Sequence, residues 1–129
     1  MPLKLSLAHG ERFVVNGAVM RNDGADASLV FENQAHILRQ KDILTNAEAC
    51  TPGSRVYLAL QCAYMFPDRR ARHIADFDRL IADFVSAAPS ATPIADRIVA
   101  LVAEDKLYGA IKECRNLVEY EAEILSHVE

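Results

Sequence analysis

Residues 3–43 constrain the fold of this chain most, because they form a succession of short runs rich in alternating apolar, β-branched or aromatic residues. The first run, Leu3–Leu7, alternates leucines with Lys4 and Ser6. Since successive side chains of a strand point to opposite faces, a strand here would bury the leucines and expose the other two. Four further runs follow before residue 40, each bounded by Gly, Asn or Asp.

Two turn signals connect these runs. Asn16-Gly17 separates two of them, and both residues tolerate the positive φ that a type I′ hairpin turn requires. The segment Asn22–Gly24 can close the next hairpin with a longer loop. We therefore expect a small antiparallel meander of about five strands, which ends near Arg39.

Helical patterns fill the chain after residue 45. Residues 54–66 are apolar nearly all round, which is typical of a helix buried on more than one side. Beyond Pro67, apolar residues from Ile74 to Val85 recur at helical spacing, and this helix should end by Pro89.

Threonine followed by proline marks two helix starts. Thr51-Pro52 and Thr92-Pro93 both resemble an N-cap with a proline in the first turn. Two apolar stripes follow the second start, and they fit either a helical hairpin or one long bent helix. A phase break near Asp105 favours the hairpin. The expected fold class is α+β, with a β-sheet region over 1–45 and a helical region over 46–129 packed on or beside it.

Composition indicates a globular, soluble protein. Hydrophobic residues make up 51% and charged residues 25% of the chain. The N-terminus runs straight into a strand pattern without a secretion signal, and no apolar run reaches membrane-spanning length. Three widely spaced cysteines, Cys50, Cys62 and Cys114, favour reduced, buried thiols. A cytoplasmic protein is the expectation.

Catalysis is not indicated. The four histidines lack metal-ligand spacing, and there is no phosphate-binding glycine loop or nucleophile elbow. We therefore expect no enzyme activity, no metal and no cofactor. The carboxylates of Glu119, Glu121 and Glu123 should point in different directions on a helix and be solvated.

Two groups of basic residues are candidate nucleic-acid contacts, although the net charge of −4 is unfavourable for binding phosphate. The strand region contributes one group: Lys4, Arg21, Arg39 and Lys41. Arg69, Arg70 and Arg72 form the other group at a helix start, where cations oppose the helix dipole. The first group could also be ordinary surface charge, and the second could be neutralised by Asp68, Asp76 or other local carboxylates.

The chain resembles the flagellar regulator family FlbT in four segments that keep their order and spacing. These segments are Met1–Leu7, Gly10–Val19, Leu38–Leu44 and Leu117–Glu121. The resemblance implies a regulator of flagellin synthesis in alphaproteobacteria that acts on the 5′ untranslated leader of flagellin messenger RNA, as a repressor in some species and an activator in others. It also implies a functional counterpart, FlaF.

The strand region is also similar to the carbon storage regulator family CsrA, a group of small RNA-binding β proteins. The similarity implies a homodimer with interlaced strands that binds RNA through its first and last strands. Lys4 and Ser6 then occupy first-strand positions, and Arg39 the last-strand arginine position. Ser6 departs from the family pattern, which has an arginine there.

Two functions remain open after these resemblances. In the first, the protein binds the flagellin leader directly, with Arg and Lys on the phosphates and an unpaired loop read at its bases. In the second, the helical region is a protein-interaction adaptor for FlaF, flagellin or another chaperone-like partner, and any effect on RNA is indirect.

Overall fold

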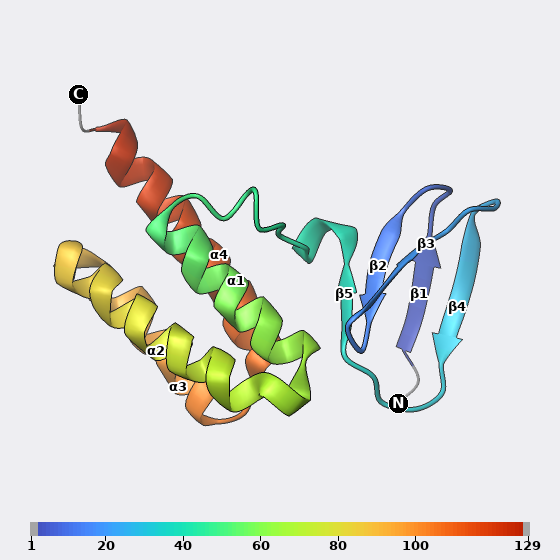
Figure 1. Ribbon diagram of the computed structural model, residues 1–129. Helices are drawn as coiled ribbons and strands as arrows, with labels where there is room; N and C mark the ends of the chain where they lie inside the picture. The colour runs from blue at the N-terminus through green and yellow to red at the C-terminus, as the bar shows by residue number, and fades with distance from the viewer. Residues whose placement is uncertain (1–2, 128–129) are drawn as a thin grey trace. The chain divides into compact units, whose positions relative to one another are not determined.

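The computed structural model describes residues 3–127 and confirms the α+β class, with strands first and helices after (Figure 1). The chain divides into two compact units, Met1–Ile43 and Leu44–Glu129. We refer to them as the β unit and the helical unit.

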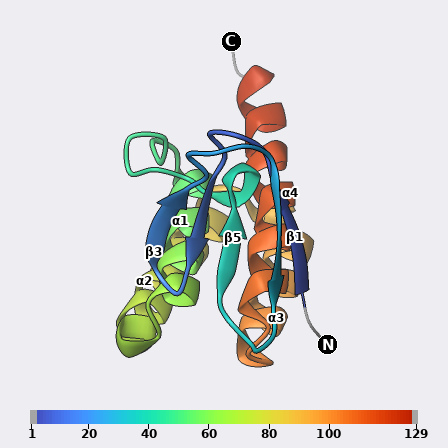
Figure 2. The ribbon, with the colours of Figure 1, turned by 90° about the vertical axis from the view of Figure 1, so that its right-hand side faces the viewer.

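The β unit contains five antiparallel strands in two sheets (Figure 1, Figure 2). The strands are β1 (Leu3–Leu7), β2 (Arg12–Val15), β3 (Ala18–Arg21), β4 (Ala27–Phe31) and β5 (Ile37–Arg39). One sheet has the order β1-β4 and the other has the order β3-β2-β5. A single meander, in which every strand pairs with the next, is therefore not formed.

The two turn signals have different outcomes. Asn16 and Gly17 have φ values of 50° and 85° and join β2 to β3 in a tight hairpin, as the sequence predicts. Asn22–Gly24 closes no hairpin, because β3 and β4 belong to different sheets.

Asn22 explains why this connection crosses between sheets. Its side-chain amide donates to the backbone oxygens of Leu7 and Ala8, each at 3.2 Å, and of Ala25 at 3.0 Å. Its backbone oxygen accepts from the Gly10 N–H at 2.7 Å. These bonds hold the segment after β3 against the turn after β1, which leads the chain to pair β4 with β1.

The core of the β unit lies between the facing sides of the two sheets. Its buried members are Leu5, Leu7, Phe13 and Ile37, with partly buried Val15, Phe31 and Ala35 against them. The expected leucine face is thus confirmed for two of three leucines, because Leu3 at the strand end stays 49% exposed.

The helical unit contains four α-helices: α1 (Pro52–Met65), α2 (Arg70–Ala87), α3 (Thr92–Ala103) and α4 (Leu107–Ser126). Thr51 caps α1 as predicted, in a capping box where its hydroxyl accepts from the Ser54 N–H and the Ser54 hydroxyl accepts from the Thr51 N–H. Thr92 is not a cap, because it already lies inside α3, where its hydroxyl donates to the Pro89 oxygen.

The helical hairpin favoured by the sequence is present as α3 and α4. Asp105 ends α3 with a φ of 60°, a left-handed conformation that prevents the helix from continuing. Phe77, Ile81 and Phe84 of α2 are buried, which confirms the apolar stripe beyond Pro67.

Glu121 corrects the expectation that all three glutamates near the end of α4 are solvated. Its side chain is buried, and its Oε2 accepts from the Gly53 N–H at 2.8 Å. A carboxylate suits this place because the first N–H groups of α1 have no partner within the helix and carry partial positive charge. A Cβ at Gly53 would come within 2.8 Å of Glu121 Oε1, so the contact also requires glycine.

Candidate nucleic-acid interface

Lys4 and Ser6 lie on one exposed face of β1, as alternation along the strand predicts. Arg39 on β5 is only half-buried, and its guanidinium donates to the backbone oxygen of Ser6 at 3.0 Å. The same guanidinium lies 3.7 Å from the Glu11 carboxylate. The structure therefore brings Arg39 to Ser6, but through a contact that links the two sheets of the β unit.

Arg21 and Lys41 do not extend this group into a single basic surface. Arg21 is on β3, in the other sheet from Lys4, and lies 3.4 Å from Asp23. Lys41 belongs to η1 (Gln40–Asp42), a short 3₁₀ helix after β5. Ordinary surface charge describes Arg21 better than a dedicated phosphate contact does.

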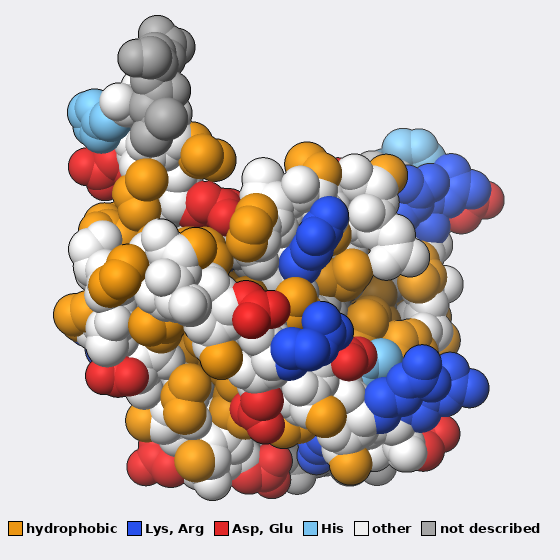
Figure 3. All heavy atoms as spheres, turned by 60° about the vertical axis from the view of Figure 1, so that its left-hand side comes forward, with side chains coloured by type: hydrophobic (Ala, Val, Ile, Leu, Met, Phe, Trp, Pro, Cys, Tyr) orange, Lys and Arg blue, Asp and Glu red, His pale blue; other side chains and the backbone are white. Residues whose placement is uncertain are grey.

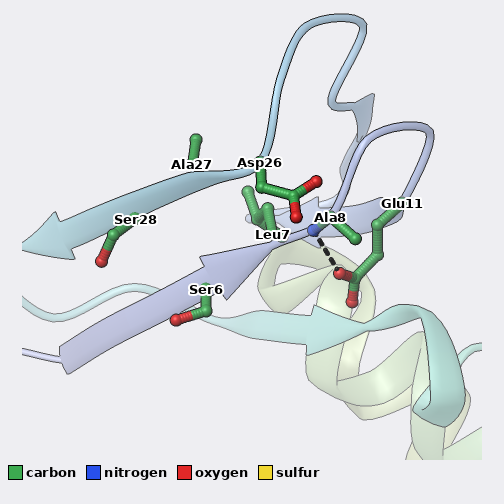
Figure 4. Close-up of a pocket in the computed structure, with 7 residues that line it drawn as sticks. All are labelled: Ser6, Leu7, Ala8, Glu11, Asp26, Ala27 and Ser28. Carbon is green, nitrogen blue, oxygen red and sulfur yellow. Dashed lines mark hydrogen bonds between the residues drawn. The ribbon is translucent and has the colours of Figure 1, made fainter.

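A hollow of about 460 Å³ lies beside Ser6 in the β unit, lined by residues of β1, β4 and the turn between β1 and β2 (Figure 4). Two carboxylates line it and are held by the turn. Glu11 Oε1 accepts from the Ala8 N–H at 2.9 Å, and Asp26 Oδ1 accepts from the His9 N–H at 3.0 Å. Negative charge at this position repels phosphate, so the hollow is a poor place for an RNA backbone.

The arginine group at the start of α2 is only partly neutralised. Arg70 donates to the Ala63 backbone oxygen at 3.1 Å and lies 3.8 Å from the Asp105 carboxylate. Arg69 and Arg72 are exposed, and neither forms an ion pair with any residue between 3 and 127. Within residues 3–127, the three arginines form no ion pair with Asp68 or Asp76, the local partners raised by the sequence, and Arg70 is paired with the distant Asp105 instead.

Aromatic side chains beside these arginines were missed by the sequence reasoning. The rings of Phe66 and His73 lie 6.3 Å apart, next to the arginines in the chain. The rings of Tyr64 and Tyr108 lie 5.8 Å apart and connect α1 to α4. His73 directly follows the arginine run in the sequence, and Phe66, which precedes it, could have been noticed, whereas the contact with Tyr108 depends on the tertiary fold.

The surface outside these groups carries both signs of charge. On the face displayed in Figure 3, Asp and Glu side chains lie next to several of the Lys and Arg side chains. Arg97 of α3 and Glu113 of α4 also form an ion pair at 2.8 Å, and the bond to Arg97 lowers the pKa of Glu113. Binding of a polyanion must therefore rely on a local excess of cations.

The thiols and other metal-ligand side chains do not add a reactive centre. Burial raises the pKa of the Cys62 and Cys114 thiols, which disfavours the reactive thiolate. Cys50 is exposed and Cys62 is half-buried, so the expectation of buried thiols holds only for Cys114. Among the residues that the structure describes, no three His, Cys, Asp or Glu side chains form a group that could hold a metal ion. None of the helices within residues 3–127 is both long and apolar enough to cross a membrane.

Comparison with known proteins gives one family. The model of the family described as "Flagellar protein FlbT" matches residues 3–125. The chain is 37% identical to the "Probable flagellum biosynthesis repressor protein FlbT" of Caulobacter sp. (strain K31), over 99% of both chains. It is 38% identical to "Probable flagellum biosynthesis repressor protein FlbT 1" of Bradyrhizobium diazoefficiens, over 100% of this chain and 88% of that one.

A third relative is named a flagellum biosynthesis repressor without the word "Probable". The "Flagellum biosynthesis repressor protein FlbT" of Caulobacter vibrioides (strain ATCC 19089 / CIP 103742 / CB 15) is 35% identical, over 99% of this chain and 92% of that protein. No solved structure matches the chain.

Proposed function

Since the chain belongs to the FlbT family of flagellar proteins, we propose that it regulates flagellum biosynthesis by binding the 5′ untranslated leader of flagellin messenger RNA, thereby controlling translation and stability of the message. The observation that carries this proposal is the family match from residue 3 to residue 125, together with full-length relatives named as flagellum biosynthesis repressors. Because translation takes place in the cytoplasm, the protein would act there.

The charge distribution limits how such binding can work. The chain has a net charge of −4, so its overall field does not favour RNA. Arg69 and Arg72 supply local cations that can hold phosphates, and Lys4 supplies another in the β unit. Few phosphate contacts imply that specificity must come largely from unpaired bases in a leader loop. A protein bound to such a loop would exclude the ribosome or alter access of nucleases.

Salt-dependent binding by the purified protein tests the proposal. The affinity for the flagellin leader is measured from 50 to 200 mM salt, beside an unrelated transcript of the same length. We expect preference for the leader, and a slope of log affinity against log salt of about −0.7 per phosphate contact. Equal binding of both transcripts, or none at low salt, would exclude direct recognition of the leader.

A groove on the helical unit favours a second candidate function, an adaptor that binds a protein. It has a volume of about 350 Å³, and apolar side chains dominate its lining, among them Leu80, Phe84 and the exposed Leu125. An apolar surface suits a protein segment better than RNA phosphates. FlaF, the counterpart implied by the family resemblance, is the proposed occupant.

Leu125→Glu separates the two functions. If the adaptor function holds, this variant should lose most of its affinity for purified FlaF in calorimetry and keep its affinity for the leader. Val99→Glu, a substitution at another exposed apolar residue of the helical unit, is the matched control. Unchanged FlaF binding by Leu125→Glu would remove the groove as the FlaF site.

A further inference from the structure

Two helix–helix connections, here called corners, lie next to each other at one end of the helical unit. The first corner joins α1 to α2, and the second joins α3 to α4; both lie at the lower end of the helices in Figure 1. Arg70 of the first corner lies 3.8 Å from Asp105 of the second. The ring contact between Tyr64 and Tyr108 joins the same two corners.

Exposed aromatic side chains gather at this end. Phe66 and Tyr108 are each 38% exposed, although an aromatic ring gains more by burial. His73 lies against Phe66, and the Lys112 ammonium lies 5.1 Å from the centre of the Tyr108 ring. A cation next to an accessible ring is the combination on which unpaired nucleic-acid bases stack. We name this surface the stacking corner: Phe66, Arg69, Arg72, His73, Tyr108 and Lys112.

Electrostatics at the stacking corner favours an anion. Three of the nearby carboxylates are already next to cations: Asp105 by Arg70 at 3.8 Å, Asp76 by Arg79 at 3.6 Å, and Glu104 by Lys106 at 4.0 Å. Asp68, in the 3₁₀ turn that precedes α2, forms no ion pair with any residue between 3 and 127. Against it stand Arg69 and Arg72, which pair with no described residue.

The dipoles of two helices add to the positive charge at the stacking corner. Both α2 and α4 begin at this end, and neither has an acidic residue in its own first turn or a side chain bonded as an N-cap. Helices of 18 and 20 residues therefore direct their positive ends to the same place. Cations at a helix start cost stability, so Arg69 and Arg72 are better explained by an anionic ligand than by the fold.

We infer that the stacking corner binds a short single-stranded stretch of RNA, with bases stacked on Phe66 and Tyr108 and phosphates held by Arg69 and Arg72. This inference rests on the proposed leader-binding function and assigns it to the helical unit, whereas the CsrA resemblance pointed to the β unit. The physical difference is that Arg39 is engaged with Ser6 and Glu11, while both arginines of the corner remain available.

The test uses the full chain with two fluorescently labelled probes, a 12-nucleotide oligouridine and the flagellin leader transcript, followed by anisotropy. Phe66→Ala and Tyr108→Ala should each weaken oligouridine binding about tenfold, because each removes one stacking surface. Phe66→Tyr should retain binding, since it keeps the ring. Arg69→Gln combined with Arg72→Gln should reduce the salt slope by about 1.4.

Controls separate binding from folding. Val99→Ala is the control for the aromatic variants, and Arg55→Gln, near the start of α1, is the control for the arginine variant, because both residues are exposed and lie outside the stacking corner. Thermal unfolding shows whether each variant is folded. If Phe66→Ala does not fold, Tyr108→Ala and the double arginine variant still test whether the stacking corner binds RNA.

The outcomes distinguish this inference from the proposed function. If the wild type binds the leader and all corner variants bind both probes as the wild type does, the inference is overturned and leader binding stands. If the corner variants lose oligouridine binding but the wild type shows no preference for the leader, the stacking corner is supported and the leader-specific function fails. Absence of any RNA binding by the wild type overturns both.

Discussion

Arg39 shows that residue type alone does not decide a binding role. The sequence places it in the last-strand arginine position of an RNA-binding pattern, but in the structure its guanidinium satisfies the Ser6 carbonyl and approaches Glu11. Glu121 is the opposite case, since a residue expected in solvent instead caps the start of α1. Both roles depend on partners distant in sequence, and no local pattern contains that information.

The first prediction concerns the contact that Arg39 makes between the two sheets. Arg39→Ala should lower the free energy of unfolding by about 1–2 kcal/mol, because a charge-assisted hydrogen bond between the sheets is lost at a half-exposed site. Lys4→Ala, on the exposed face of β1, should change it by less than about 0.5 kcal/mol. Urea unfolding followed by circular dichroism measures both values. Equal stability of the two variants would contradict the role assigned to Arg39.

At the scale of elements, local chemistry determined most of what could be predicted. Asn16-Gly17 specifies its turn because both φ values are positive, and Thr51 caps α1 with atoms only three residues away. The role of Asn22 could not be predicted in this way. Its side-chain amide donates to three backbone oxygens, and two of these, Leu7 at the end of β1 and Ala8 after it, are distant in sequence. The strands and the β2–β3 hairpin were therefore predictable, whereas the pairings of β4 with β1 and of β5 with β2 were not. The candidate site was likewise predictable only in part. The arginine run can be recognised in the sequence, but the proximity of the Tyr108 ring depends on the tertiary fold.

The second prediction concerns α2. Phe77 is fully buried, so Phe77→Ala should destabilise the protein by about 3–5 kcal/mol through lost burial and the cavity that remains. Ala82→Gly, at an exposed position of the same helix, should cost only about 1 kcal/mol from helix propensity. Thermal denaturation measures both. A melting temperature of Phe77→Ala close to that of wild type would mean that the ring is not part of the core.

At the scale of the whole molecule, the β unit leaves four strand edges unpaired. In the order β1-β4 both strands are edges, and in the order β3-β2-β5 the edges are β3 and β5. Large apolar side chains are exposed on three of these strands: Leu3 of β1 is 49% exposed, Val19 of β3 70% and Val30 of β4 56%. Unpaired, apolar edges associate unless charge or cover prevents it. A region of about 43 residues also buries too little surface to be stable without further burial.

The last prediction is a homodimer through these edges. An operation of two-fold symmetry would pair β3 of each copy with β4 of the other, and so pair two of the four edges in each copy at once. Light scattering at micromolar concentration should then report twice the 14.3 kDa mass of one chain. Val19→Lys combined with Val30→Lys should yield monomers, because each lysine would have to lose solvation in the new sheet, whereas Val99→Lys on α3 should remain dimeric. If the wild type is a monomer under these conditions, the unpaired edges do not drive association, and the homodimer with interlaced strands implied by the CsrA resemblance does not apply to this chain.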